Sequence, residues 1–491
     1  MESLGNATLA FLIFPFVAAA VIFFFGKRYQ LAQWVNILFN ILWGLLFLKL
    51  WGMRPSDSEG LPIVYYWNWL PFIKSHFSLA LDGLNMPLMA LSVFLSLTLA
   101  FYSLGKKKLG ASYLGLFFIL NGASIGSLLA ADAFLFYLFW EFMLIPLFLI
   151  IGKWGSSQRV YAALKFFAFT MAGSLFLLLA ILALAYVYKV PSLEWVDIKN
   201  TRLAFDGTWT SPQGLVFLGF LAAFAVKIPL WPFHTWLPDA HTEAPTGASV
   251  ILAGVLLKLG VFGIARWCLP LFPDAAAAAA PVMMTLACAG IVLGAFAAWN
   301  QSDIKKMIAY SSVSHLGFMV LGLFSMNEEG LQGALFQNLA HGLSTGALFL
   351  IFGIIYERTH TREIKEYGGL AQTSAPLASF FVFASLASVA LPGLPGFIGE
   401  FLVLNGTYLR SPVFALIALS GVLIGAIYTL SLLRRMIYGP VSQMISGHSI
   451  HPTWNEWVAV IPFAIAMLYL GLLPQGTLLE SAKNVTSIFS R

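Results

Sequence analysis

The chain carries, inside an apolar segment, the stretch Val226-Lys227-Ile228-Pro229-Leu230-Trp231-Pro232-Phe233-His234-Thr235-Trp236-Leu237-Pro238-Asp239. An ammonium group at bilayer depth costs about 2.5–3.5 kcal/mol, so a chain keeps one only where its charge is held or used. The prolines that follow Lys227 break a helix, and backbone groups freed at membrane depth must be buried in protein or line a cavity. A charge and a break at the same depth indicate an ion pathway.

The composition is that of a membrane protein. Of the 491 residues, 59% are hydrophobic and 10% are charged, and the mean hydropathy is +0.85. A soluble domain carries about 25% charged residues. The net charge of +6 does not indicate nucleic acid, because the basic residues concentrate in loops on one predicted side of the membrane. We therefore expect an all-α, polytopic protein in contact with lipid, with no nucleic-acid partner and a retained N-terminal span.

About 20 apolar residues cross a bilayer as a helix. The apolar segments predict fourteen spans, near residues 4–25, 31–51, 79–104, 111–130, 133–152, 160–189, 213–238, 246–269, 276–299, 304–325, 331–357, 371–409, 412–438 and 455–474. The twelfth is too long for one crossing, and the run from Leu391 to Gly396, which holds two prolines and two glycines, predicts a break within it.

Lysine and arginine in short loops indicate orientation, because they favour the cytoplasmic side. If the N-terminus faces outward, the inner loops hold the clusters Lys106–Lys108, Lys305–Lys306 and Arg434–Arg435. An even number of spans then places both termini on the outer, periplasmic side. Within one transmembrane domain, 1–491, two five-span repeats are predicted at about 111–269 and 276–438. Each repeat has a broken helix in fourth place, a pattern typical of inverted repeats around a transport site.

Ionisable side chains lie near helix centres or breaks in six of these spans. They are Glu141, Lys227, Lys258, His315, His341 and Glu400. Buried acids and bases of these types form proton relays in membrane pumps. A Glu–Lys pair that can be made and separated adds a way to convert conformational change into proton release.

Each of these residues also has a purely structural interpretation. Glu141 and Lys227 could form a static ion pair, and either histidine could hydrogen-bond across helices. Glu400 could cap a half-helix, whereas Lys258 has no acid in its own helix. All six together favour a pathway over a scaffold. Arg266, near a helix end, is expected to extend its charge to the interface.

Metal and redox sites are not expected in this chain. His234, His241 and Glu243 do not share one helical face, so a loop role is preferred to a metal site. Cys268 and Cys288 are the only cysteines and are too few for an iron–sulfur cluster. No glycine-rich phosphate loop follows a strand-like segment.

Several motifs carry a family resemblance. They are Trp140-Glu141, the run from Lys227 through Trp236–Thr246 to Leu257-Lys258-Leu259-Gly260, and Arg434-Arg435. They resemble the signature of antiporter-like subunits of respiratory complex I, which is shared with Mrp-type cation/proton antiporters and membrane-bound hydrogenases. Glu400 resembles the glutamate of NuoM-type chains, where NuoL, NuoN and Mrp relatives typically carry lysine.

The resemblance implies two inverted five-helix repeats that move protons. Glu141 and Lys227 would be the coupling pair, Lys258 the central relay and Glu400 the outward terminal group, with His315 and His341 between them. NADH, FMN, iron–sulfur clusters and quinone would bind partner subunits, leaving this chain without a redox site. Those partners would include NuoL-like and NuoN-like chains and the lateral helix of the NuoL-like chain, in a bacterial inner membrane. The alternatives are a subunit of an Mrp-type sodium/proton antiporter or of a membrane-bound hydrogenase.

Overall fold

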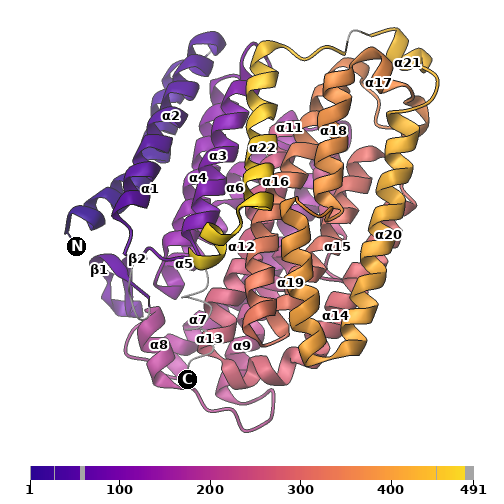
Figure 1. Cartoon of the computed structure of the whole chain (residues 1–491). Helices are drawn as coiled ribbons and strands as arrows, with labels where there is room; N and C mark the ends of the chain where they lie inside the picture. Colours follow the sequence, from indigo (N-terminus) through magenta and orange to yellow (C-terminus); the bar gives the residue numbers. More distant parts are fainter. Residues whose placement is uncertain (1, 27, 56–60, 449, 481–491) are drawn as a thin grey trace.

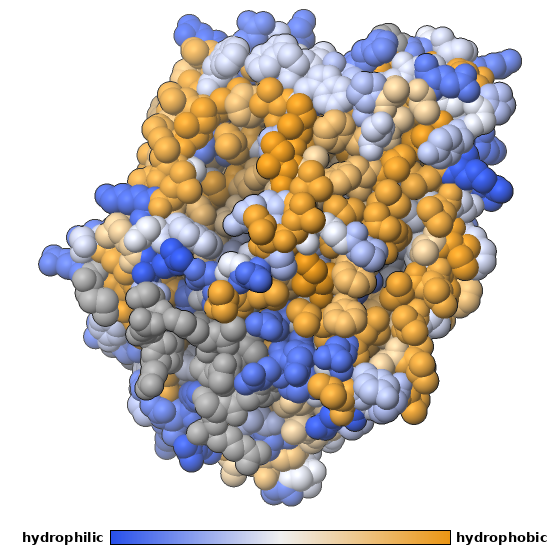
Figure 2. Space-filling view, in the orientation of Figure 1, coloured by the Kyte–Doolittle hydropathy of each residue, from blue (hydrophilic) through white to orange (hydrophobic). Residues whose placement is uncertain are grey.

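The computed structural model describes residues 2–26, 28–55, 61–448 and 450–480. The two terminal residues, which were predicted to lie on the periplasmic side, are outside the described residues. Long helices run side by side through the molecule (Figure 1). Figure 2 shows a broad belt of hydrophobic residues between hydrophilic residues at both ends. Within the described residues, twelve helices are long and apolar enough to cross a membrane, and Pro212–Lys227 and Ala375–Ser388 are shorter apolar helices. The prediction of an all-α, multi-span protein is confirmed.

In the described residues, the first part of the chain contains the α-helices α1 to α8 and one β-hairpin. In order, these are α1 Glu2–Phe24, α2 Tyr29–Met53, β1 Ile63–Leu70, the 3-10 turn η1 Pro71–Ile73, β2 Ser75–Ala80, α3 Met86–Ser103, α4 Ala111–Leu129, α5 Ala133–Phe142, α6 Leu144–Trp154, α7 Arg159–Leu182 with the π-helical turn η2 Ala183–Val187, and α8 Trp195–Thr201. The predicted span 133–152 is therefore two helices that meet at Met143.

The second part contains the two predicted breaks. Its elements are α9 Pro212–Lys227, α10 Trp236–Glu243, α11 Thr246–Ile251, the π-helical η3 Leu252–Leu256, α12 Leu257–Gly263, the π-helical η4 Ile264–Cys268, α13 Leu269–Leu271, α14 Pro273–Trp299, α15 Ile304–Phe324, α16 Glu328–Thr359, the 3-10 turn η5 Ile364–Glu366, α17 Leu370–Thr373, α18 Ala375–Ser388, α19 Pro395–Arg410, α20 Pro412–Met436, α21 Gln443–Ser446 and α22 Trp454–Leu472. The breaks fall between α9 and α10 and between α18 and α19, as predicted. The inverted-repeat relationship stays a prediction.

The hairpin was not predicted; it lies between the predicted spans 31–51 and 79–104, and β2 extends into the second of them. Strands β1 and β2 pair antiparallel. Asp132 caps α5 by accepting hydrogen bonds from the backbone N–H groups of Phe134 and Leu135. The same carboxylate accepts hydrogen bonds from Ser75 Oγ at 2.8 Å and His76 N at 2.9 Å. One buried acid thus ties the hairpin to the helix bundle.

The two ends of the bundle differ in composition. The hairpin and α8 lie at one end, and α17 and α21 lie at the other (Figure 1). We call the first the hairpin end. The second, here the basic end, holds Lys106, Lys305, Arg358, Arg362 and Arg435. The loop-charge rule predicts that such an end faces the cytoplasm, and this orientation stays a prediction.

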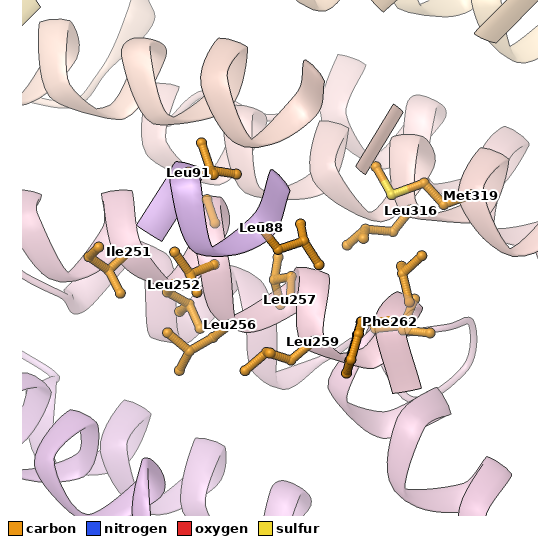
Figure 3. Packing of buried hydrophobic residues seen from close by; sticks show 14 of the residues in the cluster. Leu88, Leu91, Ile251, Leu252, Leu256, Leu257, Leu259, Phe262, Leu316 and Met319 are labelled. Carbon is orange, nitrogen blue, oxygen red and sulfur yellow. The ribbon is translucent and has the colours of Figure 1, made fainter. Parts of the chain in front are cut away.

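The span from α11 to α13 forms the centre of the molecule. Its most apolar window is fully buried, as expected for a helix that is hydrophobic on all sides. Leu256, Leu257 and Leu259 belong to the same buried hydrophobic cluster as Leu88 of α3 and Leu316 of α15 (Figure 3). Lys258 lies within this apolar packing and is 1% exposed.

Glycines bring α19 close to α16. A Cβ at Gly333 would lie 2.6 Å from the backbone nitrogen of Val403, and one at Gly406 would lie 2.3 Å from that of Gly330. The backbones therefore approach as in small-residue helix interfaces of membrane proteins. This contact positions the half-helix that carries Glu400.

Arg266 corrects one expectation. Its guanidinium does not extend to the interface but is buried and ion-paired with Asp82, in the segment between β2 and α3. A partner from a distant segment satisfies the charge inside the protein, which a single-helix pattern cannot reveal. The pair fastens the central span to α3.

We expect Asp82→Asn to destabilise the protein by about 3 kcal/mol, because it leaves a buried guanidinium without its counter-charge. The amide keeps the oxygen that accepts the N–H groups of Leu84 and Asn85. The control is Glu480→Gln, which removes the partly exposed pair with Arg54 and should cost about 0–1 kcal/mol. Unfolding in detergent, followed by loss of helical circular dichroism, measures both. Equal stability of the two variants would contradict the prediction.

Candidate functional site

Lys258 and His341 form the centre of the site. Lys258 Nζ lies 2.5 Å from His341 Nδ1, and both side chains are buried. The Asn338 side chain donates to the Lys258 carbonyl at 3.3 Å. The π-helical turns η3 and η4 flank α12, the helix that carries this lysine. Such turns often accompany functional sites in helices.

His315 connects this centre to Glu400. The rings of His341 and His315 have centroids 5.2 Å apart. His315 Nδ1 lies 2.9 Å from Glu400 Oε1, and its Nε2 lies 3.4 Å from Ser388 Oγ. Gln337 Nε2 also donates to Glu400 Oε1 at 3.1 Å. Lys258, His341, His315 and Glu400, from four different helices, thus form one contiguous polar chain in the protein interior.

A small cavity lies beside the Glu400 end of this chain. It measures about 10 Å³, and Ser314, His315, Glu400 and Tyr428 are among its lining residues. This is close to the space that one water molecule needs. The cavity also touches Val389, in the break between α18 and α19. The broken helix therefore places free space next to the carboxylate, as its proline and glycine pattern indicated.

Glu141 and Lys227 are near one another but not in contact. Their charges interact, yet no ion pair within 4.0 Å joins them in the described chain. Lys227 Nζ lies 4.9 Å from the centroid of the Trp140 ring and has no hydrogen-bond partner among the described residues. A cation over a tryptophan face is stabilised by the ring quadrupole. Ser174 interacts with the Glu141 carboxylate, so the two charges are held apart.

His241 was not predicted as part of the pathway. The sequence analysis assigned it to a loop, but His241 and Glu243 lie on α10, and only His234 lies in the turn. His241 is fully buried, stacks on Phe349 with centroids 4.6 Å apart, and has no described partner for either ring nitrogen. In the described part of the chain, no group of three or more His, Cys, Asp or Glu side chains could hold a metal ion.

Three residues that hold the site in place were not predicted. Gln337, Asn338 and Ser388 each contact a predicted pathway residue or its backbone. Trp140, expected only as part of the Trp140-Glu141 motif, packs its ring against Lys227. The sequence carried a signal for Gln337 and Asn338. Gln337, Asn338 and His341 occupy positions i, i+1 and i+4 of one apolar helix, a polar cluster that a membrane span does not need for stability.

The chain belongs to the NADH:quinone oxidoreductase/Mrp antiporter transmembrane family, whose model matches residues 130–425. Within that family it is similar to NADH-quinone oxidoreductase subunit M of Rhodobacter capsulatus, with 40% identity over 452 residues, 90% of this chain and 87% of the relative. The structure is similar to a chain of respiratory complex I from Thermus thermophilus with bound NADH. That match has a TM-score of 0.88 at 32% identity and covers 99% of this chain and 100% of the other.

An Mrp complex from Dietzia sp. contains a chain of the same fold. Its TM-score is 0.85 at 20% identity, over 100% of this chain and 98% of the other. At this identity the likeness concerns the fold alone.

Proposed function

We propose that this chain is a proton-translocating membrane subunit of an NADH–quinone oxidoreductase. In this proposal the pathway consists of Glu141, Lys227, Lys258, His341, His315 and Glu400. The single observation that carries it is the unbroken contact series from Lys258 Nζ through both histidines to Glu400. Groups that can each bind and release a proton and that lie in contact in an apolar interior form a relay.

The separated Glu141–Lys227 pair supplies the coupling in this proposal. When Lys227 pairs with Glu141, its charge is compensated and Lys258 can take up a proton. When Lys227 returns to the Trp140 face, its uncompensated charge repels the proton on Lys258. The proton then moves through His341 and His315 to Glu400, which faces the hairpin end and the outer side. The structure supports the second of these states, because Lys227 lies over the Trp140 ring.

Moving one charge against the membrane potential costs about 2.3 kcal/mol per 100 mV. We infer that redox chemistry in partner subunits, which would hold FMN, iron–sulfur clusters and the NADH and quinone sites, supplies this energy. Partners would be NuoL-like and NuoN-like chains and the lateral helix of the former. The basic end would face the cytoplasm of a bacterium with the complex in its inner membrane, and both termini would lie on the periplasmic side.

The test of this function is Lys227→Ala. We expect the complex to assemble and proton pumping to fall by about tenfold or more, with a matching loss of coupled NADH–quinone activity. The dye-detected acidification of inverted membrane vesicles measures pumping. The control is Lys107→Ala, which removes an exposed lysine at the basic end. Wild-type pumping by a correctly assembled Lys227→Ala complex would refute the assignment.

A further inference from the structure

A second cavity lies at the basic end of the bundle, close to the Glu400 cavity described above. It measures about 20 Å³, and its lining includes Trp299, Gln301, Ser431, Arg435 and Tyr428. We call it the Arg435 cavity. Arg435 and Trp299 are exposed, so this cavity is next to the solvent at the basic end. Its volume suffices for a water molecule.

Tyr428 of α20 is the one described residue that lines both cavities. It is 4% exposed, so its ring fills the space between them. Helical side chains tilt toward the N-terminus of their helix, and for α20 this direction leads from the basic end toward the depth of Glu400. A Cβ at Gly425, which lines the Glu400 cavity, would lie 4.0 Å from the Tyr428 hydroxyl. The hydroxyl is therefore on the Glu400 side of the ring.

The surroundings of this hydroxyl suit proton transfer. It interacts with the side chain of Ser311 and with the charge of Glu400. A phenol hydroxyl both donates and accepts a hydrogen bond. It can release its proton toward Glu400 and accept another from a water molecule in the Arg435 cavity, so that no net charge stays on the ring.

We propose that Tyr428 is the gate of a second proton entrance, which leads from the basic end to Glu400 without passing through Lys258. The proposal rests on the proposed function. It also shows how the protein would meet a requirement that applies to every proton pump. Glu400 must not communicate with both sides of the membrane at once, and one aromatic ring separates it from the solvent-adjacent cavity.

The first test removes the ring. In membrane vesicles that contain the assembled complex and receive an imposed pH gradient but no NADH, Tyr428→Ala should merge the cavities. The gradient should then decay several-fold faster than in wild type. Adding Glu400→Gln to Tyr428→Ala should restore the wild-type decay, because the leak passes through the carboxylate. The control is Tyr408→Ala, which truncates an exposed aromatic residue of α19 and should leave the gradient stable.

The second test keeps the ring and removes only the hydroxyl. Tyr428→Phe vesicles should hold an imposed gradient as wild type does, while NADH-driven proton pumping falls several-fold. The proposal is overturned if Tyr428→Ala vesicles hold the gradient, if the leak persists in the double variant, or if Tyr428→Phe pumps at the wild-type rate. Normal pumping by Lys227→Ala would refute the proposed function instead. The passive leak is measured without NADH, so the two failures are distinguishable.

Discussion

Lys258→Met should abolish proton translocation while the complex still assembles. In the proposed pathway Lys258 lies between the Glu141–Lys227 pair and the two histidines, and its ammonium group touches His341 Nδ1. Proton release from Glu400 is driven through this contact, so its loss stops pumping whichever entrance supplies the proton. Methionine has a similar length and no proton to transfer, so we expect pumping to fall by about a hundredfold or more. Because the substitution also removes a charge from an apolar interior, stability should be unchanged or higher. Vesicle acidification and thermal unfolding of the same preparation measure the two effects.

The same variant separates a relay from a scaffold. If the buried charges only hold helices together, Lys258→Met changes stability and leaves pumping intact. The control is Leu257→Met, a volume-conserving change at the neighbouring fully buried position, which should pump as wild type does. Equal pumping by both variants would refute a relay through Lys258.

Gly333→Ala should also eliminate most pumping, although position 333 carries no charge. Its new Cβ would lie 2.6 Å from the backbone nitrogen of Val403, so α16 and α19 have to separate. The separation lengthens the contacts of Glu400 with Gln337 and His315, which are now 3.1 and 2.9 Å. A shift of about 1 Å at a reacting group can cost a hundredfold in rate. Vesicle acidification measures the loss, and overpacking should lower stability by about 1–3 kcal/mol.

Gly44→Ala is the matched control for this helix contact. A Cβ at Gly44 of α2 meets Val93 Cγ1 at 3.8 Å, an ordinary packing distance. The substitution should therefore leave pumping unchanged and stabilise α2 slightly, because alanine is the better helix former. If Gly333→Ala pumps as Gly44→Ala does, the close approach of α16 and α19 does not position Glu400.

The breaks and spans could be predicted because their signals are local. Proline lacks a backbone donor and clashes with the preceding turn, so Pro229, Pro232, Pro392 and Pro395 mark the interrupted helices wherever they lie in the fold. The hairpin was missed because its strands are short and lie between long helices. The π-helical turns beside Lys258 have no proline or glycine pattern that distinguishes them from ordinary buried helix.

The contacts within the site could not be predicted in the same way. Asp82 and Arg266 are far apart in the chain, and only their meeting shows that Arg266 is not an interfacial residue. Glu141 and Lys227 were expected to be a coupling pair; in the structure their charges interact without direct contact, and Lys227 lies over the Trp140 ring. Both outcomes depend on how whole helices pack.

The sequence by itself determined that this chain is a multi-span membrane protein with two interrupted helices and a set of buried ionisable residues. Those properties follow from the free-energy cost of placing polar groups in lipid. This cost applies to each segment separately, whatever its neighbours in the fold. Only the tertiary structure decided that Lys258, His341, His315 and Glu400 form one chain of contacts, and that Tyr428 lines both the cavity beside Glu400 and the cavity at the basic end. Such proximities are set by the packing of α12, α15, α16, α19 and α20, which joins residues distant in the sequence.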